Sequence, residues 1–424
     1  MTTATIDLPN AGPKSTSVLA VFLRLLSANW NWGRLTVVMP DGARHQLNGK
    51  NPGHSAVLTV HSRRFALRVL RNGDIGFAEG YMAGEWDSPD LPILLETLVN
   101  NYDHIRRLFD GHPIMKWING LDHWFNRNSR RGSRRNIHAH YDLGNRFYEA
   151  WLDPSMTYSS ARFEAPGQSL EQGQQNKYAA LARMMDLGPD QSLLEIGCGW
   201  GGFAEYAARE CGARVTGITI SKEQHDYARR RLFEAGLAER ADIRLVDYRD
   251  VEGQYDRIAS IEMFEAVGRQ YWPTYFNKLR EVLAPDGHAA LQIITIRDDL
   301  FDEYEARTDF IQKYVFPGGS LPSEAQIAPI LAQAGLAQTK VDRFGMDYAQ
   351  TLAGWARQFE SGWSQISGLD RNFDARFKRL WRFYLAYCEA GFRSNRTDVI
   401  QISLHHQTRP RAPHRTGRDG FQSA

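Results

Sequence analysis

Apolar residues change their spacing repeatedly along the C-terminal half of the chain, which predicts alternating strands and helices. Short apolar runs typical of buried strands are separated by stretches with helical spacing. The predicted strands are Leu193–Ile196, Arg214–Thr219, Ile243–Val246, Arg257–Ile261, Ala289–Thr295, Gln338–Arg343 and Asp398–Leu404. A helix is expected near Glu324–Ala334, and a mostly helical insertion at about 350–392. This alternation favours an α/β fold with a parallel, Rossmann-like sheet covered on both faces.

The N-terminal part of the chain has a different pattern, which predicts a small α+β domain over residues 18–125. From Val18 to Leu26 the apolar residues follow helical spacing. Residues 34–75 contain short β-branched runs broken by PDG, NGK, NPG and NGD, and they predict a β-rich module. Helical spacing returns at Leu91–Phe109.

Three polar segments flank or separate these regions. Residues 1–17 are rich in Pro, Ser and Thr and predict a flexible leader, and residues 405–424 predict a disordered tail. Residues 126–136, NRNSRRGSRRN, form a basic linker that either meets anionic lipid headgroups or is a solvated hinge. The main domain then covers residues 137–404.

Composition and charge narrow the class of protein. The 424 residues are 42% hydrophobic and 24% charged, as in ordinary globular proteins. A formal net charge of +2 argues against a large nucleic-acid surface. The three cysteines have no metal-ligand spacing, so we predict no metal site and reduced thiols in the cytoplasm. The first residues lack a signal-peptide pattern, and no run of about 18 apolar residues predicts a membrane span.

A glycine-rich loop follows the first predicted strand in LLEIGCGWGG, Leu193–Gly202. Glycines allow a close approach of backbone to a ligand, and the following helix offers free amide groups. The spacing is not the G-x-G-x-x-G of dinucleotide sites, and the next strand ends in Thr219-Ile220-Ser221-Lys222 without a carboxylate. Both features argue against NAD. Glu195 can order the loop and attract the ammonium group of a methionine moiety, which favours S-adenosylmethionine over a merely tight turn.

Seven motifs occur in an order that resembles the cyclopropane-fatty-acyl-phospholipid synthase family, which includes the mycolic acid cyclopropane synthases. The motifs are HYDLGN (140–145), WLDPSMTYSSARF (151–163), LLEIGCGWGG (193–202), TGITISKEQ (216–224), MFEAVG (263–268), FPGGSLPS (316–323) and YAQTL (348–352). The resemblance covers about residues 136–404 and implies a class I methyltransferase sheet with helical insertions. More weakly, GDIGFAEGYMAGEWD (73–87) is similar to the family's lipid-engaging domain.

The resemblance implies a set of residues around S-adenosylmethionine. Gln224 would hold the ribose, and Asp247 with Tyr248 would lie on the adenine side. The other matched cofactor positions are Tyr158, Ser159, Gly197, Gly199 and Thr219.

The implied reaction is methyl transfer to the double bond of an unsaturated phospholipid acyl chain. The resulting carbocation needs a dry site, and aromatic faces can stabilise it. Candidates for such faces are Phe264, Trp272, Tyr314 and Phe316, each of which ordinary core packing would also explain.

In the family, the base that takes the final proton is understood to be a bicarbonate ion. Its matched partners here are Glu265, Tyr348 and the backbone of Ile294. Ser160 replaces the usual cysteine and Gln292 the usual histidine, but both side chains can still donate hydrogen bonds. The product is therefore either a cyclopropane or a methylene, methyl-alkene or methyl-branched chain. Nearby Glu262 is expected to belong to a structural ion pair.

Three other functions compete with this interpretation. A nucleic-acid methyltransferase would need an Asn/Asp-Pro-Pro-aromatic motif where this chain has Glu262-Met263-Phe264-Glu265. A small-molecule methyltransferase would not explain the N-terminal domain. A non-catalytic protein that binds lipid and S-adenosylmethionine stays open because of Ser160 and Gln292. The expected setting is cytoplasmic, peripheral at the membrane surface, with a homodimer favoured by two attachment points.

Overall fold

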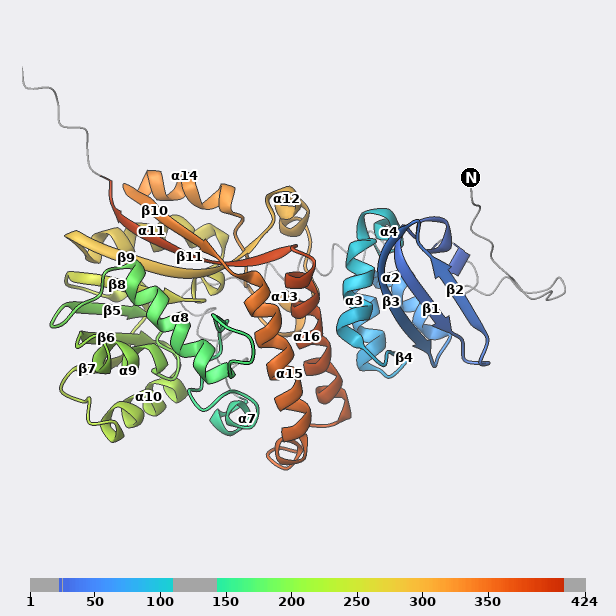
Figure 1. The fold of residues 1–424 in the computed structure, drawn as a ribbon, viewed down its shortest axis with the longest axis horizontal. Helices are drawn as coiled ribbons and strands as arrows, with labels where there is room; N and C mark the ends of the chain where they lie inside the picture. The colour runs from blue at the N-terminus through green and yellow to red at the C-terminus, as the bar shows by residue number, and fades with distance from the viewer. Residues whose placement is uncertain (1–22, 25, 110–142, 408–424) are drawn as a thin grey trace, which may run out of the picture.

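The structure, a computed structural model, describes residues 23–24, 26–109 and 143–407, which form two lobes side by side (Figure 1). The predicted leader, the basic linker and most of the predicted tail lie outside the described residues. His405 and His406, which we assigned to the tail, instead end the last strand of the large lobe.

A seven-stranded sheet forms the centre of the large lobe, as the alternating pattern predicts. Its strand order is β10-β11-β9-β8-β5-β6-β7. The five strands from β9 to β7 pair in parallel, whereas β11 pairs antiparallel with both β9 and β10. The sheet is therefore mixed, and the parallel prediction holds for its nucleotide-side half. The bounds are β5 (Ser192–Ile196), β6 (Arg214–Thr219), β7 (Ala241–Leu245), β8 (Tyr255–Ile261), β9 (Leu283–Ile296), β10 (Leu336–Arg343) and β11 (Thr397–His406).

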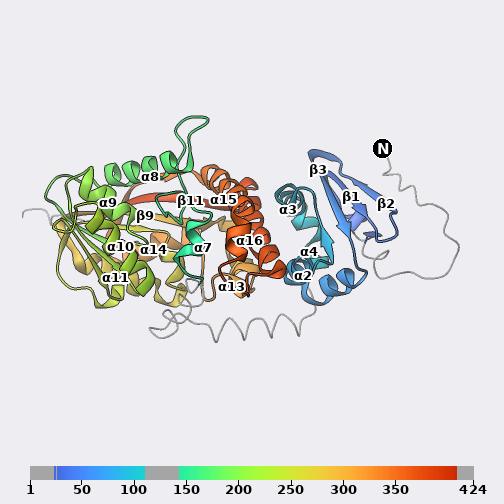
Figure 2. The ribbon, with the colours of Figure 1, turned by 90° about the horizontal axis from the view of Figure 1, so that it is seen from below.

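Helices cover both faces of this sheet (Figures 1 and 2). Ser169 and Gln172 form a capping box at the start of α8, and Ser221 caps α10. The α-helices are α7 (Asn145–Glu149), α8 (Leu170–Met184), α9 (Gly202–Arg209), α10 (Lys222–Glu234), α11 (Trp272–Val282), α12 (Phe301–Glu305), α13 (Phe310–Tyr314), α14 (Glu324–Ala334), α15 (Gly345–Ser367) and α16 (Ala375–Arg393). Short 3-10 turns are η1 (Tyr248–Asp250), η2 (Phe264–Ala266), η3 (Arg269–Tyr271) and η4 (Asp298–Leu300). None of the helices in the described part of the chain is long and apolar enough to cross a membrane.

The small lobe is the predicted α+β domain, but its β-rich part is shorter than expected. A four-stranded sheet of order β2-β1-β3-β4 is followed and covered by helices. The prediction of a β-rich module to residue 75 is wrong from Arg64 onward, because the apolar residues Phe65, Ala66 and Val69 follow helical spacing and are buried. The NGD turn survives only as a kink at Gly73. The bounds are β1 (Trp32–Val38), β2 (Arg44–Asn48), β3 (Asn51–Val60), β4 (Trp86–Asp87), α2 (Arg64–Met82), α3 (Leu91–Asn100) and α4 (Tyr102–Phe109).

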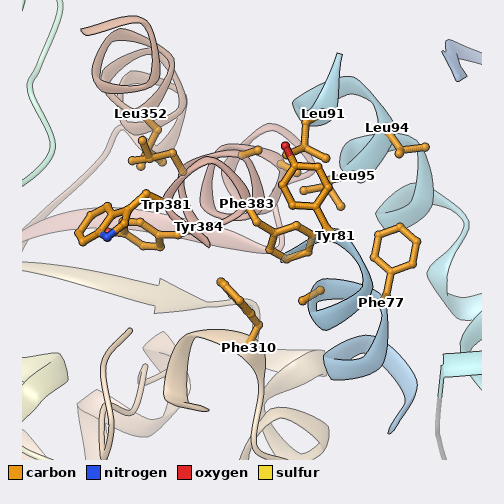
Figure 3. Packing of buried hydrophobic residues seen from close by; sticks show 14 of the residues in the cluster. Phe77, Tyr81, Leu91, Leu94, Leu95, Phe310, Leu352, Trp381, Phe383 and Tyr384 are labelled. Carbon is orange, nitrogen blue, oxygen red and sulfur yellow. The ribbon is translucent and has the colours of Figure 1, made fainter. Parts of the chain in front are cut away.

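An aromatic cluster joins the two lobes. Phe383 of α16 packs against Phe310 of the large lobe at 4.8 Å between ring centroids and against Tyr81 of α2 at 5.7 Å. Phe77, also of α2, belongs to the same aromatic cluster (Figure 3). Arg379 of α16 adds polar contacts, donating to the carbonyl oxygen of Trp86 at 2.7 Å. The two lobes therefore share one hydrophobic core.

Candidate active site

One large cavity lies where the two lobes meet. Its volume is about 530 Å³. The last residues of three parallel strands, Ile196, Thr219 and Ile261, form part of its wall, where open α/β sheets place their ligands. Phe77 of α2 and Leu98 of α3 line another part of the same wall. The cavity thus connects the nucleotide side of the sheet with apolar side chains of the N-terminal lobe.

The glycine-rich loop borders this cavity, and glycine is required or favoured at its positions for different reasons. Gly197, at φ 82°, leaves no room for a side chain because an added Cβ would come within 2.7 Å of Met263 Cγ. At Gly202 an added Cβ would lie 2.4 Å from the hydroxyl oxygen of Tyr178. At Gly199 the space is open, with nothing within 4 Å, which suits the approach of a cofactor.

Glu195 is buried beside this loop with one unsatisfied oxygen. Burial raises the pKa of Glu195 to about 8, and the nearby Lys177 opposes that shift. The oxygen Oε2 has no hydrogen-bond partner among the described residues. Since Glu195 lines the cavity, a cationic ligand group would stabilise its charged form. These features fit the ammonium group of S-adenosylmethionine.

Lys177 of α8 is a functional candidate that sequence reasoning missed. Its side chain is fully buried and donates a 2.7 Å hydrogen bond from Nζ to Oγ of Ser159. Burial lowers the pKa of Lys177 to about 7, although attraction to Glu262, Asp153 and Glu195 acts in the opposite direction. Nothing local in the sequence marks this lysine, because its carboxylate neighbours come from other segments.

Every residue predicted to contact the cofactor lines the cavity. The Thr219 hydroxyl donates to the amide oxygen of Gln224 at 2.9 Å, so the NH₂ group of Gln224 keeps its capacity to donate to a ribose. The hydroxyl groups of Tyr158 and Tyr384 lie 2.8 Å apart. The lining set from the prediction is Tyr158, Ser159, Glu195, Gly197, Gly199, Thr219, Gln224, Asp247 and Tyr248.

The five predicted partners of the anion divide into two groups. Glu265, Ile294 and Tyr348 line the cavity, whereas Ser160 and Gln292 do not. The Ser160 hydroxyl donates to the carbonyl oxygen of Ala161 at 2.8 Å rather than toward the cavity.

Glu265 has one bound and one unpaired carboxylate oxygen. The Ile294 backbone amide donates to Oε1 at 2.5 Å, and Oε2 has no partner among the described residues. Burial, followed by repulsion from Glu262, raises the pKa of Glu265 to about 8. Below about pH 8 this carboxyl group is therefore mostly neutral, and a positive charge arising in the cavity would favour its ionised form.

Glu262 accepts hydrogen bonds from the three remaining predicted residues, although Ser160 donates through its backbone amide and not through its hydroxyl. Its Oε1 accepts from the Ser160 amide at 2.9 Å and from the Gln292 side chain at 2.8 Å. Its Oε2 accepts from the Tyr348 hydroxyl at 2.7 Å. The expectation of a structural ion pair is wrong for the described residues, because these neutral donors are its partners and its carboxylate borders the cavity.

Only one of the four aromatic candidates lies on the cavity wall. Phe316 lines it, with ring centroids 6.5 Å from Tyr158 and 6.1 Å from Tyr384. Phe264 and Trp272 pack in the core of the large lobe. Tyr314 donates to Glu79 at 2.6 Å and is not part of the wall. Of the four predicted residues, Phe316 therefore presents an aromatic side chain to the cavity, together with the neighbouring Tyr158 and Tyr384.

The fold and the glycine-rich site define the class of this protein as an S-adenosylmethionine-dependent methyltransferase. A coclaurine N-methyltransferase structure matches at a TM-score of 0.59 over 78% of this chain and 98% of that one, and at 18% identity this likeness concerns the fold. The model of the family described as mycolic acid cyclopropane synthetase matches residues 128–402. The chain belongs to this family.

Two named relatives match most of the chain, and a solved structure matches about two thirds of it. A tuberculostearic acid methyltransferase, UfaA1, of Mycobacterium tuberculosis is 38% identical over 93% of this chain and 92% of its own length. A cyclopropane-fatty-acyl-phospholipid synthase of Escherichia coli strain K12 is 34% identical over 88% and 93%. The mycolic acid cyclopropane synthase CmaA1, solved with SAH and CTAB, has a TM-score of 0.60 and 28% identity over 64% of this chain and 97% of that one.

Proposed function

We propose that this enzyme transfers the methyl group of S-adenosylmethionine to the double bond of an unsaturated phospholipid acyl chain. One observation carries the proposal: a single cavity joins the glycine-rich loop, two carboxylates and an apolar wall that both lobes build. The names of the relatives support the same substrate class, since they refer to fatty acyl phospholipid, mycolic acid and tuberculostearic acid.

The described residues suit an alkene better than a polar acceptor. When bound, the cofactor supplies an electrophilic methyl carbon on a sulfonium. The apolar residues Phe77, Leu98 and Phe316 keep water from the carbocation that methyl transfer creates on the chain. The unpaired oxygen of Glu265 offers a negative charge to the same centre.

The bicarbonate ion stays a prediction from the resemblance, and the geometry speaks against its fit. Ser160, Gln292 and Tyr348 already donate to Glu262, and Ile294 donates to Glu265. An added anion would therefore lack donors and would face two carboxylates. We derive no step from bicarbonate.

The first half of α2 supports binding at a membrane surface. Leu67 and Leu70 are 55% and 40% exposed and follow helical spacing. Arg64 and Arg71 are exposed on the same helix, and the exposed Arg63 directly precedes it. Apolar side chains with adjacent arginines suit the interface of an anionic bilayer. The second half of α2 reaches the cavity through Phe77, so a lipid chain would have a short route inward from this face. A homodimer would present two such faces.

The decisive experiment offers radiolabelled S-adenosylmethionine to the enzyme with vesicles. Label should enter phospholipid with mono-unsaturated chains and not phospholipid with saturated chains. Mass spectrometry of the product then assigns the added carbon as ring, branch or methylene. Cofactor binding without transfer to any lipid would favour a lipid-binding relative, and transfer only to water-soluble amines or hydroxyls would favour a small-molecule enzyme.

The membrane proposal has its own test. Replacing Leu67 and Leu70 together by Asp should weaken sedimentation with anionic vesicles about tenfold. Phe233→Asp is the matched control, because Phe233 is 74% exposed on α10 in the large lobe. Equal weakening by the control, or none by the α2 variant, would contradict this membrane face.

A further inference from the structure

The backbone at Glu262 has an unusual conformation that a side chain makes costly. Its φ is 49°, in the left-handed region where glycine is the least strained residue. A non-glycine residue there costs on the order of 1 kcal/mol or more and persists where the surroundings fix it. Strain of this kind at the wall of a cavity points to a task for the carboxylate that the strained residue carries.

The hydrogen bonds around Glu262 fix its carboxylate from three separate segments. Ser160, Gln292 and Tyr348 lie 102, 30 and 86 positions away in the sequence. Gln292 is itself oriented, because its amide oxygen accepts from Gln401 at 3.0 Å and its NH₂ group is thereby directed to Glu262. The carboxylate is therefore held in one place at the cavity wall, next to Glu265.

We propose that the Glu262 carboxylate is the built-in base of this site and replaces an exchangeable bicarbonate ion. The inference rests on the proposed function and extends it to the residue that removes the last proton. Two side chains that the family resemblance assigns to the ion, Gln292 and Tyr348, donate instead to this carboxylate. The backbone amide of Ser160 adds a third hydrogen bond to it, while the Ser160 hydroxyl donates to Ala161. Burial raises the pKa of Glu262, which suits a proton acceptor, while its three hydrogen bonds and the buried Lys177 act in the opposite direction and favour the ionised form.

The proton transfer balances without any further reagent. Methyl transfer forms a C–C bond while the C–S bond breaks, and it leaves a carbocation on the neighbouring chain carbon. A C–H bond then breaks, either in the new methyl group or on the chain carbon beside the cation, and its proton passes to an oxygen of Glu262. Its electron pair closes a cyclopropane ring if the proton leaves the new methyl group, or forms a C=C bond if it leaves the chain. Glu262 finally releases the proton to water.

The first test removes bicarbonate from the assay. Turnover of the unchanged enzyme on mono-unsaturated phospholipid vesicles is measured in buffer stripped of CO₂ and again with bicarbonate added. We expect equal rates, and ¹³C-labelled bicarbonate should show no saturable binding by NMR. A rate that requires added bicarbonate would overturn this inference and leave the proposed function intact, whereas no methyl transfer in either buffer would overturn both.

The second test changes the residue itself. Glu262→Gln should lower turnover at least about 100-fold while calorimetry shows unchanged S-adenosylmethionine affinity. Glu262→Gly removes the strain and frees the three donors, so bicarbonate or formate should restore part of its turnover and labelled bicarbonate should now bind. Glu252→Gln, at an exposed glutamate, is the matched control and should keep full rate. Full activity of Glu262→Gln, or no rescue and no ion binding in Glu262→Gly, would overturn the inference.

Discussion

At the scale of single residues, two carboxylates three positions apart face one cavity with different partners. Glu262 accepts three hydrogen bonds, whereas Glu265 accepts one from Ile294 and leaves Oε2 unpaired. A fully hydrogen-bonded carboxylate is held in position, while an unpaired one is open to a cation in the cavity. We therefore propose different roles for the two residues: Glu262 is the base, and Glu265 stabilises the carbocation.

Glu265→Gln should bind cofactor normally and lose most of its turnover, on the order of 100-fold. Glutamine keeps the size of the side chain and an oxygen that can accept from Ile294, but it removes the negative charge. Single-turnover transfer of labelled methyl, together with calorimetric affinity for S-adenosylmethionine, measures the two effects separately. Full activity of this variant would show that Glu265 has no part in the reaction.

The raised pKa of Glu265 also predicts a pH-dependent stability difference. The pKa of the Glu265 carboxyl group is about 8 in the folded protein, above its ordinary value in the unfolded chain. Its contribution to stability is therefore complete when the pH is below that ordinary value, and it is lost as the pH rises through 8. Glutamine stays neutral throughout. The melting temperature of Glu265→Gln minus that of the unchanged cofactor-free enzyme should therefore grow between pH 5 and pH 8, by on the order of a few degrees.

Thermal unfolding at four pH values in this range measures the difference. Glu252→Gln, on the surface, should show a flat difference and serves as the control. Lys177 also titrates near neutral pH, but it is common to both proteins and cancels. A difference for Glu265→Gln that stays flat or falls would contradict the assigned burial of this carboxyl group.

At the scale of elements, α2 serves two surroundings because it is kinked. At Gly73 the backbone has φ 61° and ψ −133°, which only glycine adopts easily. Before the kink, Leu67 and Leu70 face solvent, and after it Phe77 lines the cavity. A straight helix would direct these faces differently, so the kink joins the exposed half of α2, where we propose membrane binding, to the half that lines the cavity.

Gly73→Ala should cost about 1–3 kcal/mol of unfolding free energy and raise the KM for phospholipid vesicles. Gly42→Ala is the matched control, since Gly42 also has a positive φ of 84° but lies in the turn between β1 and β2 with open space around it. Chemical denaturation should show a stability loss for both, and only Gly73→Ala should change KM. An unchanged KM in Gly73→Ala would separate the kink from substrate entry.

At the scale of the whole molecule, both lobes contribute to the wall of the cavity, so their docking shapes it. Arg379 of α16 donates to the carbonyl oxygens of Tyr81 and Trp86 and pairs with Asp87 at 2.9 Å. Its guanidinium also lies 3.9 Å from the ring centroid of Tyr81. One side chain of the large lobe thus contacts three residues of the small lobe, Tyr81, Trp86 and Asp87.

Arg379→Ala should lower the rate of methyl transfer to vesicles about tenfold or more without changing affinity for S-adenosylmethionine. The reason is that the lost contacts join the lobes, whereas the predicted cofactor residues all belong to the large lobe. Arg371→Ala, at an exposed arginine just before α16, is the control and should leave both quantities unchanged. A weakened cofactor affinity in Arg379→Ala would show that the damage spreads beyond the lobe contact.

Much of the fold could be predicted because its signals are local. The β5 strand, the glycine loop and α9 follow each other in LLEIGCGWGG, and α14 spans the predicted residues Glu324–Ala334. The helix that begins at Arg64 was not predicted because the turn-forming residues within it obscured the helical spacing of its apolar residues. The antiparallel position of β11 between β9 and β10 was also missed, since strand order depends on pairing between distant segments.

The sequence by itself determined most strands of the large sheet and the glycine-rich loop, because neighbours in the chain produce those features. Only the tertiary structure decided which groups meet Glu262 and Lys177. Their partners come from segments that are distant in the sequence, and the burial that shifts the pKa of Lys177 arises only when those segments pack. A hydrogen-bond partner of this kind is a property of the folded chain, whereas a strand or a turn is encoded over a few adjacent residues.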